Sequence, residues 1–130
     1  MKQVISTDKG AAPKGPYSQG VVTGGRLLYV AAQGPFDPRS GETVSDDFPE
    51  QAAQAFRNLL AVAEAAGAGP EDAVKVTVYL TDWAHFQAMN RVYQQFFPEP
   101  YPVRTPVQTT LPFGLIMVDG VFALPEGGGA

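Results

Sequence analysis

The chain has 130 residues, of which 45% are hydrophobic and 17% charged, a composition typical of one ordered globular domain. Its formal net charge of −4 and its nine scattered basic residues give no general electrostatic footprint for a nucleic-acid backbone. The absence of cysteine excludes disulfides, thiolate nucleophiles and cysteine-based metal sites.

No stretch of the sequence is apolar for long enough to form a membrane helix, and the opening residues lack the apolar core of a signal peptide. We therefore expect a cytoplasmic protein in which residues 1–130 form a single domain. The glycine-rich end, about residues 125–130, is predicted to be a flexible tail.

The first half of the chain predicts strands followed by a helix. Residues 1–16 are expected to form a short strand and a loop, and the apolar residues 26–35, which end at a Gly-Pro pair, a buried strand. Residues 48–66 place apolar side chains at spacings of three and four, which predicts a helix. Asp47 before it and Gly67 after it are typical helix-end signals.

The second half predicts a strand, a helix and two strands. Residues 73–81 alternate between apolar and polar, as a strand with one buried face does. Asp82 is placed to cap a second helix over residues 86–97. Further strands are predicted at about residues 107–110 and 115–124.

This order predicts an α+β fold in which a mixed β-sheet carries two helices packed on one face. The strand segments YVAA and LIMVDGVFA are apolar on both faces. Because water does not favour such a surface, we expect other subunits to close the second face of the sheet.

Arg104 is the first candidate for chemistry, because it stands in a neighbourhood nearly free of other positive charge. An arginine beside a strand commonly pairs with Asp or Glu. Its other use is a two-pronged grip on the carboxylate of a ligand, which the planar guanidinium fits better than lysine does. The sequence leaves both uses open.

Asp119 and Tyr17 have two interpretations each, and His85 has one. Asp119, inside the apolar run LIMVDGVFAL, is either a general acid or base or part of a turn or bulge at the end of a strand. Tyr17 is either a site residue or a packed aromatic, and His85, the one histidine, is interpreted as a surface residue. The sequence has no phosphate-binding glycine loop and no set of metal ligands, so no metal and no cofactor are predicted.

Several blocks together resemble the RidA/YjgF family, also called the L-PSP endoribonuclease-like family. They run in order over nearly the whole chain: GPYSQG at 15–20, YVAAQGPFDPRSGE at 29–42, EQAAQAFRNLLAVAEAAGA at 50–68, VKVTVYLTD at 74–82, FQAMNRVYQQFF at 86–97, PVRT at 102–105 and LP at 111–112. The resemblance implies a chorismate-mutase-like fold and a homotrimer with a pocket in each of its three inter-subunit clefts.

The resemblance also implies the residues of the site. Arg104 matches the arginine that grips the substrate carboxylate, Tyr17 matches the tyrosine of the GPY motif, and Asn90 matches a helix asparagine. A gap-free count from Arg104 places Asp119 where the family has its water-activating glutamate. If the alignment slips by one residue, Val118 takes that place.

Other positions of the implied substrate site depart from the family pattern. Ala31 and Ala32 stand where relatives have Ser-Gly, although Gln33 after them is retained. Pro106 stands where relatives often have cysteine or another small residue, and a proline offers no backbone N–H to a ligand.

The implied activity is hydrolysis of reactive enamines and imines, such as 2-aminoacrylate, to 2-keto acids and ammonia without metal or organic cofactor. The alternative is a non-catalytic protein that binds small carboxylates such as 2-keto acids. Cleavage of single-stranded RNA is a further alternative, which the acidic net charge disfavours.

Overall fold

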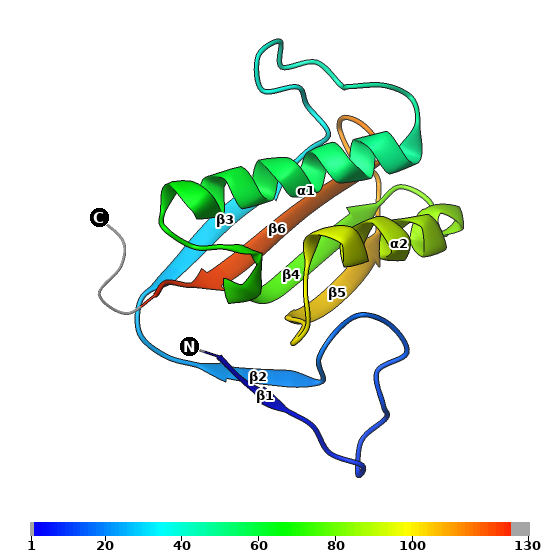
Figure 1. The fold of residues 1–130 in the computed structure, drawn as a ribbon. Coiled ribbons are helices and arrows are strands. Elements are labelled where there is room, and N and C mark those ends of the chain that lie inside the picture. Colours follow the sequence, from blue (N-terminus) through cyan, green and yellow to red (C-terminus); the bar gives the residue numbers. More distant parts are fainter. Residues whose placement is uncertain (1, 126–130) are drawn as a thin grey trace.

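The computed structural model describes residues 2–125, which form two sheets and two helices (Figure 1). A two-stranded antiparallel sheet consists of β1 (Lys2–Ile5) and β2 (Gly20–Thr23). The main sheet has the order β3-β6-β4-β5 and consists of β3 (Leu27–Gln33), β4 (Ala73–Leu80), β5 (Val103–Gln108) and β6 (Ile116–Ala123).

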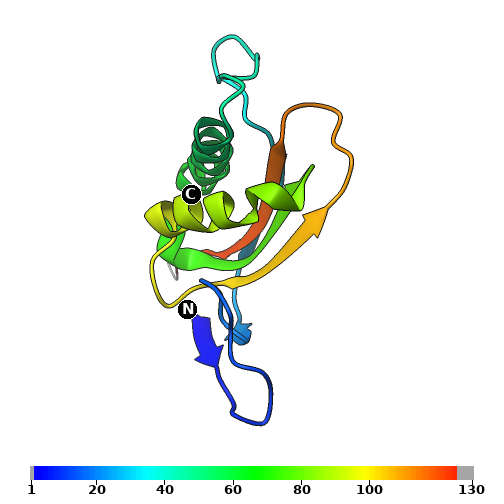
Figure 2. The ribbon, with the colours of Figure 1, turned by 90° about the vertical axis from the view of Figure 1, so that its right-hand side faces the viewer.

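The main sheet is mixed, because β4 pairs parallel with β5 while its other strand pairs are antiparallel. Helices α1 (Phe48–Ala65) and α2 (Phe86–Phe96) both lie on one face of this sheet (Figure 2). Short 3₁₀ turns, η1 (Pro70–Asp72) and η2 (Trp83–His85), precede β4 and α2. The predicted arrangement of a mixed sheet with two helices on one face is confirmed.

Helix α1 starts and stops where its sequence signals predict. The Asp47 carboxylate accepts a hydrogen bond from the Glu50 backbone N–H at 3.0 Å, which satisfies one of the free donors of the first turn. Gly67 follows the helix with φ of +91°, a conformation that glycine adopts without steric cost. Asp82 caps the 3₁₀ turn η2, which runs directly into α2, rather than α2 itself.

The strand predicted at about 107–110 is wrong in its bounds, because β5 begins at Val103 and ends at Gln108. Its sequence, VRTPVQ, lacks apolar alternation, so its strand character comes from parallel pairing with β4 rather than from its own pattern. Pro106 is tolerated inside it because β5 is an edge strand. Arg104 therefore lies within a strand and not ahead of one. Strand β2 was not predicted at all.

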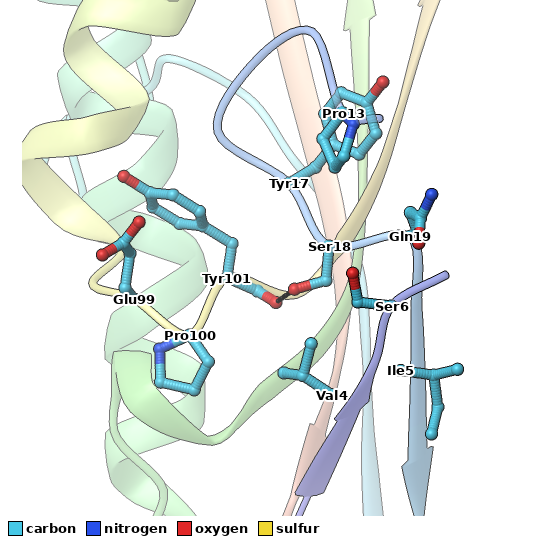
Figure 3. A pocket seen from close by; sticks show the side chains of 10 residues that line it. All are labelled: Val4, Ile5, Ser6, Pro13, Tyr17, Ser18, Gln19, Glu99, Pro100 and Tyr101. Carbon is cyan, nitrogen blue, oxygen red and sulfur yellow. Dashed lines mark hydrogen bonds between the residues drawn. The ribbon is translucent and has the colours of Figure 1, made fainter. Parts of the chain in front are cut away.

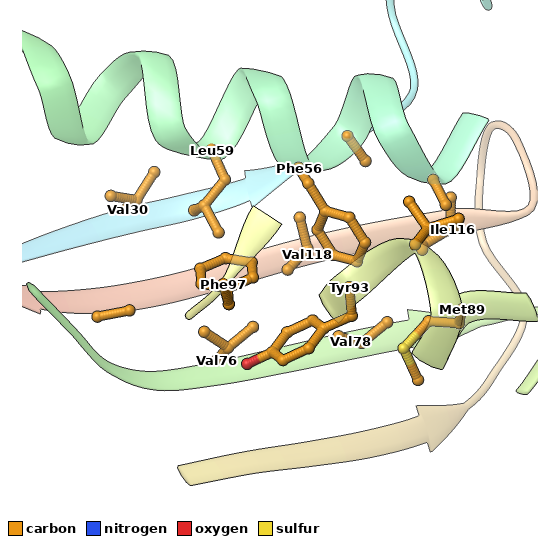
Figure 4. Close-up of a cluster of buried hydrophobic side chains, with 14 of the residues drawn as sticks. Val30, Phe56, Leu59, Val76, Val78, Met89, Tyr93, Phe97, Ile116 and Val118 are labelled. Atoms are coloured by element: carbon orange, nitrogen blue, oxygen red, sulfur yellow. The ribbon is translucent and has the colours of Figure 1, made fainter. Parts of the chain in front are cut away.

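The core lies between the sheet and the two helices (Figure 4). Phe56 of α1 meets Tyr93 of α2 edge to face at 5.6 Å, and Tyr93 stacks on Phe97 at 4.5 Å between ring centroids. Gly120 of β6 lets helix α1 pack close to the sheet, since a Cβ at this position would lie 3.4 Å from the Leu59 side chain. Aromatic packing thus fixes α2 against α1.

No helix of residues 2–125 packs on the second face of the main sheet (Figure 2). Tyr29 of β3 is 72% exposed there, and its neighbour in the ladder, Val121, is half-buried. The β3 part of this face is therefore apolar, as the sequence predicted, while β4 adds Lys75 and Thr77 to it and β6 adds Asp119.

Neither helix within residues 2–125 has the length and apolar character that crossing a bilayer requires. The tail predicted at about residues 125–130 lies outside the described residues, except for Pro125.

Candidate active site

A pocket of about 390 Å³ opens at the edge strand β5, between the start of α2 and the loop that precedes β2. Arg104 reaches this pocket from the helix side of the sheet, because its partner in the ladder, Val76, belongs to the core. The residues that line the pocket are Lys14, Gly15, Tyr17, Phe86, Arg104, Thr105 and Pro106.

Helix α2 supplies the polar contacts of the Arg104 side chain. Nη1 of Arg104 donates a hydrogen bond of 2.7 Å to Oδ1 of Asn90, and the Met89 sulfur lies 3.8 Å from the same nitrogen. Only 6% of the arginine is exposed. Asn90 therefore orients the guanidinium group, which is a role the sequence did not assign to it.

Aromatic rings surround the same guanidinium group. Its central carbon lies 5.0 Å from the ring centroid of Tyr93, 5.8 Å from that of Tyr17 and 5.9 Å from that of Phe86. Each such cation–π contact is worth about 0.5–2 kcal/mol, more where water is excluded. The rings stabilise the cation without neutralising its charge.

Arg104 has no counter-ion within residues 2–125, since its hydrogen-bond acceptors are Asn90 and Met89. Within residues 2–125 of one chain, Arg104 therefore makes no pair with Asp or Glu. Burial lowers the pKa of Arg104, and the nearby Tyr93 and Tyr17 oppose that effect. A buried cation that lacks an anion is costly unless something else supplies one, so this pocket is suited to an anionic ligand.

Nη2 of Arg104 is the nitrogen free to meet such a ligand, because no acceptor in residues 2–125 takes a hydrogen bond from it. Nε is buried without a partner and is out of reach. The backbone of Gly15 runs past Nη2, since a Cβ on Gly15 would lie 3.6 Å from that atom. A larger residue in place of Gly15 would narrow the path by which a ligand reaches Nη2 of Arg104.

Tyr17 forms one wall of the pocket. Its hydroxyl accepts a hydrogen bond of 3.2 Å from the backbone N–H of Lys14, so the loop closes on itself. On the other side of this loop lies a second hollow of about 450 Å³, where Ser18 donates a hydrogen bond to the carbonyl of Tyr101 (Figure 3). Pro106 also lines the Arg104 pocket, as the sequence predicted for a binding residue.

The other predicted binding residues lie elsewhere in the chain. Ala31, Ala32 and Gln33 belong to β3, which is the opposite edge of the main sheet from β5. The β3–β6 register is irregular between Val30 and Gln33, and the two alanines are exposed. A single chain therefore does not bring these residues to Arg104.

Asp119 lies on the uncovered face of the sheet, opposite to Arg104. Its carboxylate accepts a hydrogen bond of 2.9 Å from the Tyr79 hydroxyl, and this bond is the main cause of the raised pKa of Tyr79. β6 pairs regularly with β4 through Asp119 and Gly120, so these residues form no turn, whereas the irregularity of the β3–β6 ladder lies opposite Asp119, between Val30 and Gln33. Val118 faces the core and is fully buried, so the slipped alignment would place a core side chain in the site.

His85 takes no part in the pocket, because its ring stacks on Phe48 at 4.3 Å between centroids. Sequence reasoning missed Phe86, Met89 and Tyr93 as neighbours of Arg104. They recur at a spacing of three and four along α2, which is also the spacing of a helix that packs on a core, so the sequence does not separate the two roles. It also missed Lys14 and Tyr79, for which no local pattern gave a signal.

The chain belongs to the endoribonuclease L-PSP family, whose model matches residues 7–115. This is the family that the sequence motifs predicted. The chain is 44% identical over 110 residues to a RutC family protein of Pyrococcus horikoshii, covering 85% of this chain and 86% of that protein.

Two other proteins carry more specific descriptions. The chain is 39% identical over 127 residues to a human 2-iminobutanoate/2-iminopropanoate deaminase, covering 98% of this chain and 83% of the relative. It also resembles the crystal structure of E. coli TdcF with bound serine, with a TM-score of 0.72, 34% identity and coverage of 95% of this chain and 99% of that one.

Replacement of Asn90 by alanine tests whether this amide satisfies Arg104. We expect Asn90→Ala to lower the free energy of unfolding by about 1–3 kcal/mol, because a buried N–H of the arginine loses its acceptor. In an Arg104→Met background the same change is expected to cost little, since the orphaned donor is gone. Denaturant unfolding at one fixed protein concentration measures both costs.

The matched control is Gln94→Ala, which removes an exposed amide from the same helix and is expected to be near neutral in both backgrounds. An equal cost of Asn90→Ala with and without Arg104 would show that Asn90 stabilises α2 by some other contact.

Proposed function

We propose that the protein hydrolyses reactive enamines and imines of the 2-aminoacrylate type to 2-keto acids and ammonia, with Arg104 holding the substrate carboxylate. The observation that carries this proposal is the buried guanidinium group of Arg104, which has no counter-ion within residues 2–125 and has Nη2 free toward the pocket. The human relative named as an imine deaminase and the serine bound to TdcF, a ligand with a carboxylate, both support it.

The reaction itself requires few catalytic groups. Water adds to the electrophilic carbon of the C=N bond, the resulting carbinolamine takes up a proton on nitrogen, and ammonia leaves as the C=O bond forms. Arg104 fixes the carboxylate, while Tyr17 and Phe86 shield the reacting carbon from bulk water. A carboxylate that moves the proton contributes roughly 10²–10⁴-fold.

We assign that proton transfer to Asp119 of a neighbouring copy. Within one chain Asp119 and Arg104 occupy opposite faces of the sheet, so the two can cooperate only across an interface. The uncovered apolar face on which Asp119 lies is the surface that the proposed homotrimer buries. The same assembly would bring Ala31, Ala32 and Gln33 of β3 to the pocket of a neighbour, with Asn90 orienting the arginine.

The second candidate function is binding of small carboxylates without turnover. It is favoured by the absence of any carboxylate from the residues that line the Arg104 pocket. RNA cleavage has less support, because the chain carries a net charge of −4. Release of ammonia from an imine made in situ distinguishes the first two functions.

The assembly is tested by sedimentation. We expect a species of three times the chain mass at micromolar concentration, because the exposed Tyr29 face gains stability by leaving water. A Tyr29→Glu variant places a charge on that face and is expected to shift the equilibrium toward monomer. A wild-type chain that sediments as a monomer would contradict the inter-subunit site.

The grip on the carboxylate is tested by Arg104→Lys. Lysine keeps a charge but lacks the planar fork that points one nitrogen at Asn90 and another at the ligand, so the affinity for 2-ketobutyrate is expected to fall by roughly tenfold to a hundredfold. Calorimetric titration measures it. Arg91→Lys, an exposed change in α2, is the control and is expected to leave the affinity unchanged. Equal affinities of the wild type and of both variants would show that Arg104 does not bind the carboxylate.

The role of Asp119 is tested by Asp119→Ala in single-turnover assays of ammonia release. We expect the rate to fall by roughly 10²–10⁴-fold, with 2-ketobutyrate affinity changed by less than about twofold. Thr77→Val is the control, because Thr77 lies opposite Asp119 in the β4–β6 ladder and shares its face. Full activity of Asp119→Ala would assign proton transfer to another group.

A further inference from the structure

The Arg104 pocket carries two positive charges and no negative one. Lys14 and Arg104 are among the residues that line it, while no Asp or Glu is among them. This is unusual in a chain with 13 acidic and nine basic residues. The local charge is therefore opposite to that of the whole molecule, as a site for anions requires.

We propose that the pocket selects substrates with two carboxylates, namely imines of amino acids whose side chain is itself acidic. Arg104 holds the carboxylate next to the imine carbon, and Lys14 holds the carboxylate of the side chain. The proposal rests on the proposed imine hydrolysis and adds to it the class of substrate.

Lys14 is held at the pocket by its own loop. Its backbone N–H donates to the Tyr17 hydroxyl at 3.2 Å, and the Tyr17 N–H donates to the Gly15 carbonyl at 2.8 Å. Because Gly15, the next residue, lies against Nη2 of Arg104, the loop places Lys14 beside the arginine. No hydrogen bond or ion pair with a residue in the range 2–125 occupies the Lys14 ammonium group, so it is available to a ligand.

The two cations suit two different tasks. Arg104 is buried and fixed by Asn90, so it sets the position of the reacting end of the substrate. Lys14 is exposed on a flexible four-carbon stem, so it can follow a carboxylate at more than one distance. Four-carbon and five-carbon dicarboxylates both meet this requirement.

The pocket also has room for the longer substrate. Its volume of about 390 Å³ lies within the range of sites that hold drug-sized ligands, so space remains beside a three-carbon acid. The added carboxylate takes no part in the reaction. Water adds to the C=N carbon and ammonia leaves as before, and the product is a 2-keto dicarboxylate.

The experiment compares 2-oxoglutarate, which has two carboxylates, with 2-ketobutyrate, which has one, by calorimetric titration of the whole chain. We expect the wild type to bind 2-oxoglutarate more tightly. Lys14→Met, which keeps most of the length of the side chain and removes its charge, is expected to weaken 2-oxoglutarate binding by about three- to tenfold and to leave 2-ketobutyrate binding unchanged. Lys14→Arg is expected to restore the preference.

Lys9→Met is the matched control, because Lys9 is an exposed lysine of the same loop region that does not line the pocket. It is expected to change neither affinity. Equal weakening by the Lys9 and Lys14 variants would overturn the proposal in favour of a general effect of net charge. A Lys14→Met variant that keeps the preference for 2-oxoglutarate would also overturn it.

The outcomes separate the two proposals. If wild type binds 2-ketobutyrate through Arg104 but shows no preference that depends on Lys14, the substrate class is wrong and the carboxylate site stands. If neither acid binds, the carboxylate site fails as well, and the proposed function fails with it.

Discussion

The hydrogen bond from Nη1 of Arg104 to Asn90 is the interaction on which the pocket depends. An arginine in the apolar layer between a sheet and a helix is costly, because its charge loses water. One amide acceptor and three aromatic rings compensate for part of that loss and fix the side chain, yet none of them neutralises it. The buried, preorganised cation thus lowers the stability of the fold, and a bound anionic ligand can offset that cost.

The sheet divides the candidate chemistry between its two faces. The helix face presents Arg104, whereas the uncovered face presents Asp119 with its hydrogen bond from Tyr79. Each face alone has a simple structural explanation, as a cation packed on aromatic rings or a carboxylate paired with a phenol. Under the proposed function the two halves meet only when copies assemble, so activity would depend on protein concentration in the range where the assembly dissociates.

The helices and strands with one buried face could be predicted from the sequence, because burial of one face gives the apolar residues a regular spacing along the chain. The stripe of α1 and the alternation of β4 are of this kind. Strand β5 could not be placed, since VRTPVQ has no period and owes its form to pairing with β4. Arg104 was found as an isolated charge, but the partners that orient it belong to α2, whose aromatic residues also serve the core. The opposite faces of Arg104 and Asp119 depend on sheet order, which no local pattern contains.

Pro106 has a consequence for the behaviour of the chain among its neighbours. An edge strand normally offers a row of N–H and C=O groups to any extended segment that comes near, and β5 is such an edge. The proline removes one donor from the middle of that row. A foreign strand cannot complete a regular ladder there, so the edge is protected against the sheet extension that leads to aggregation.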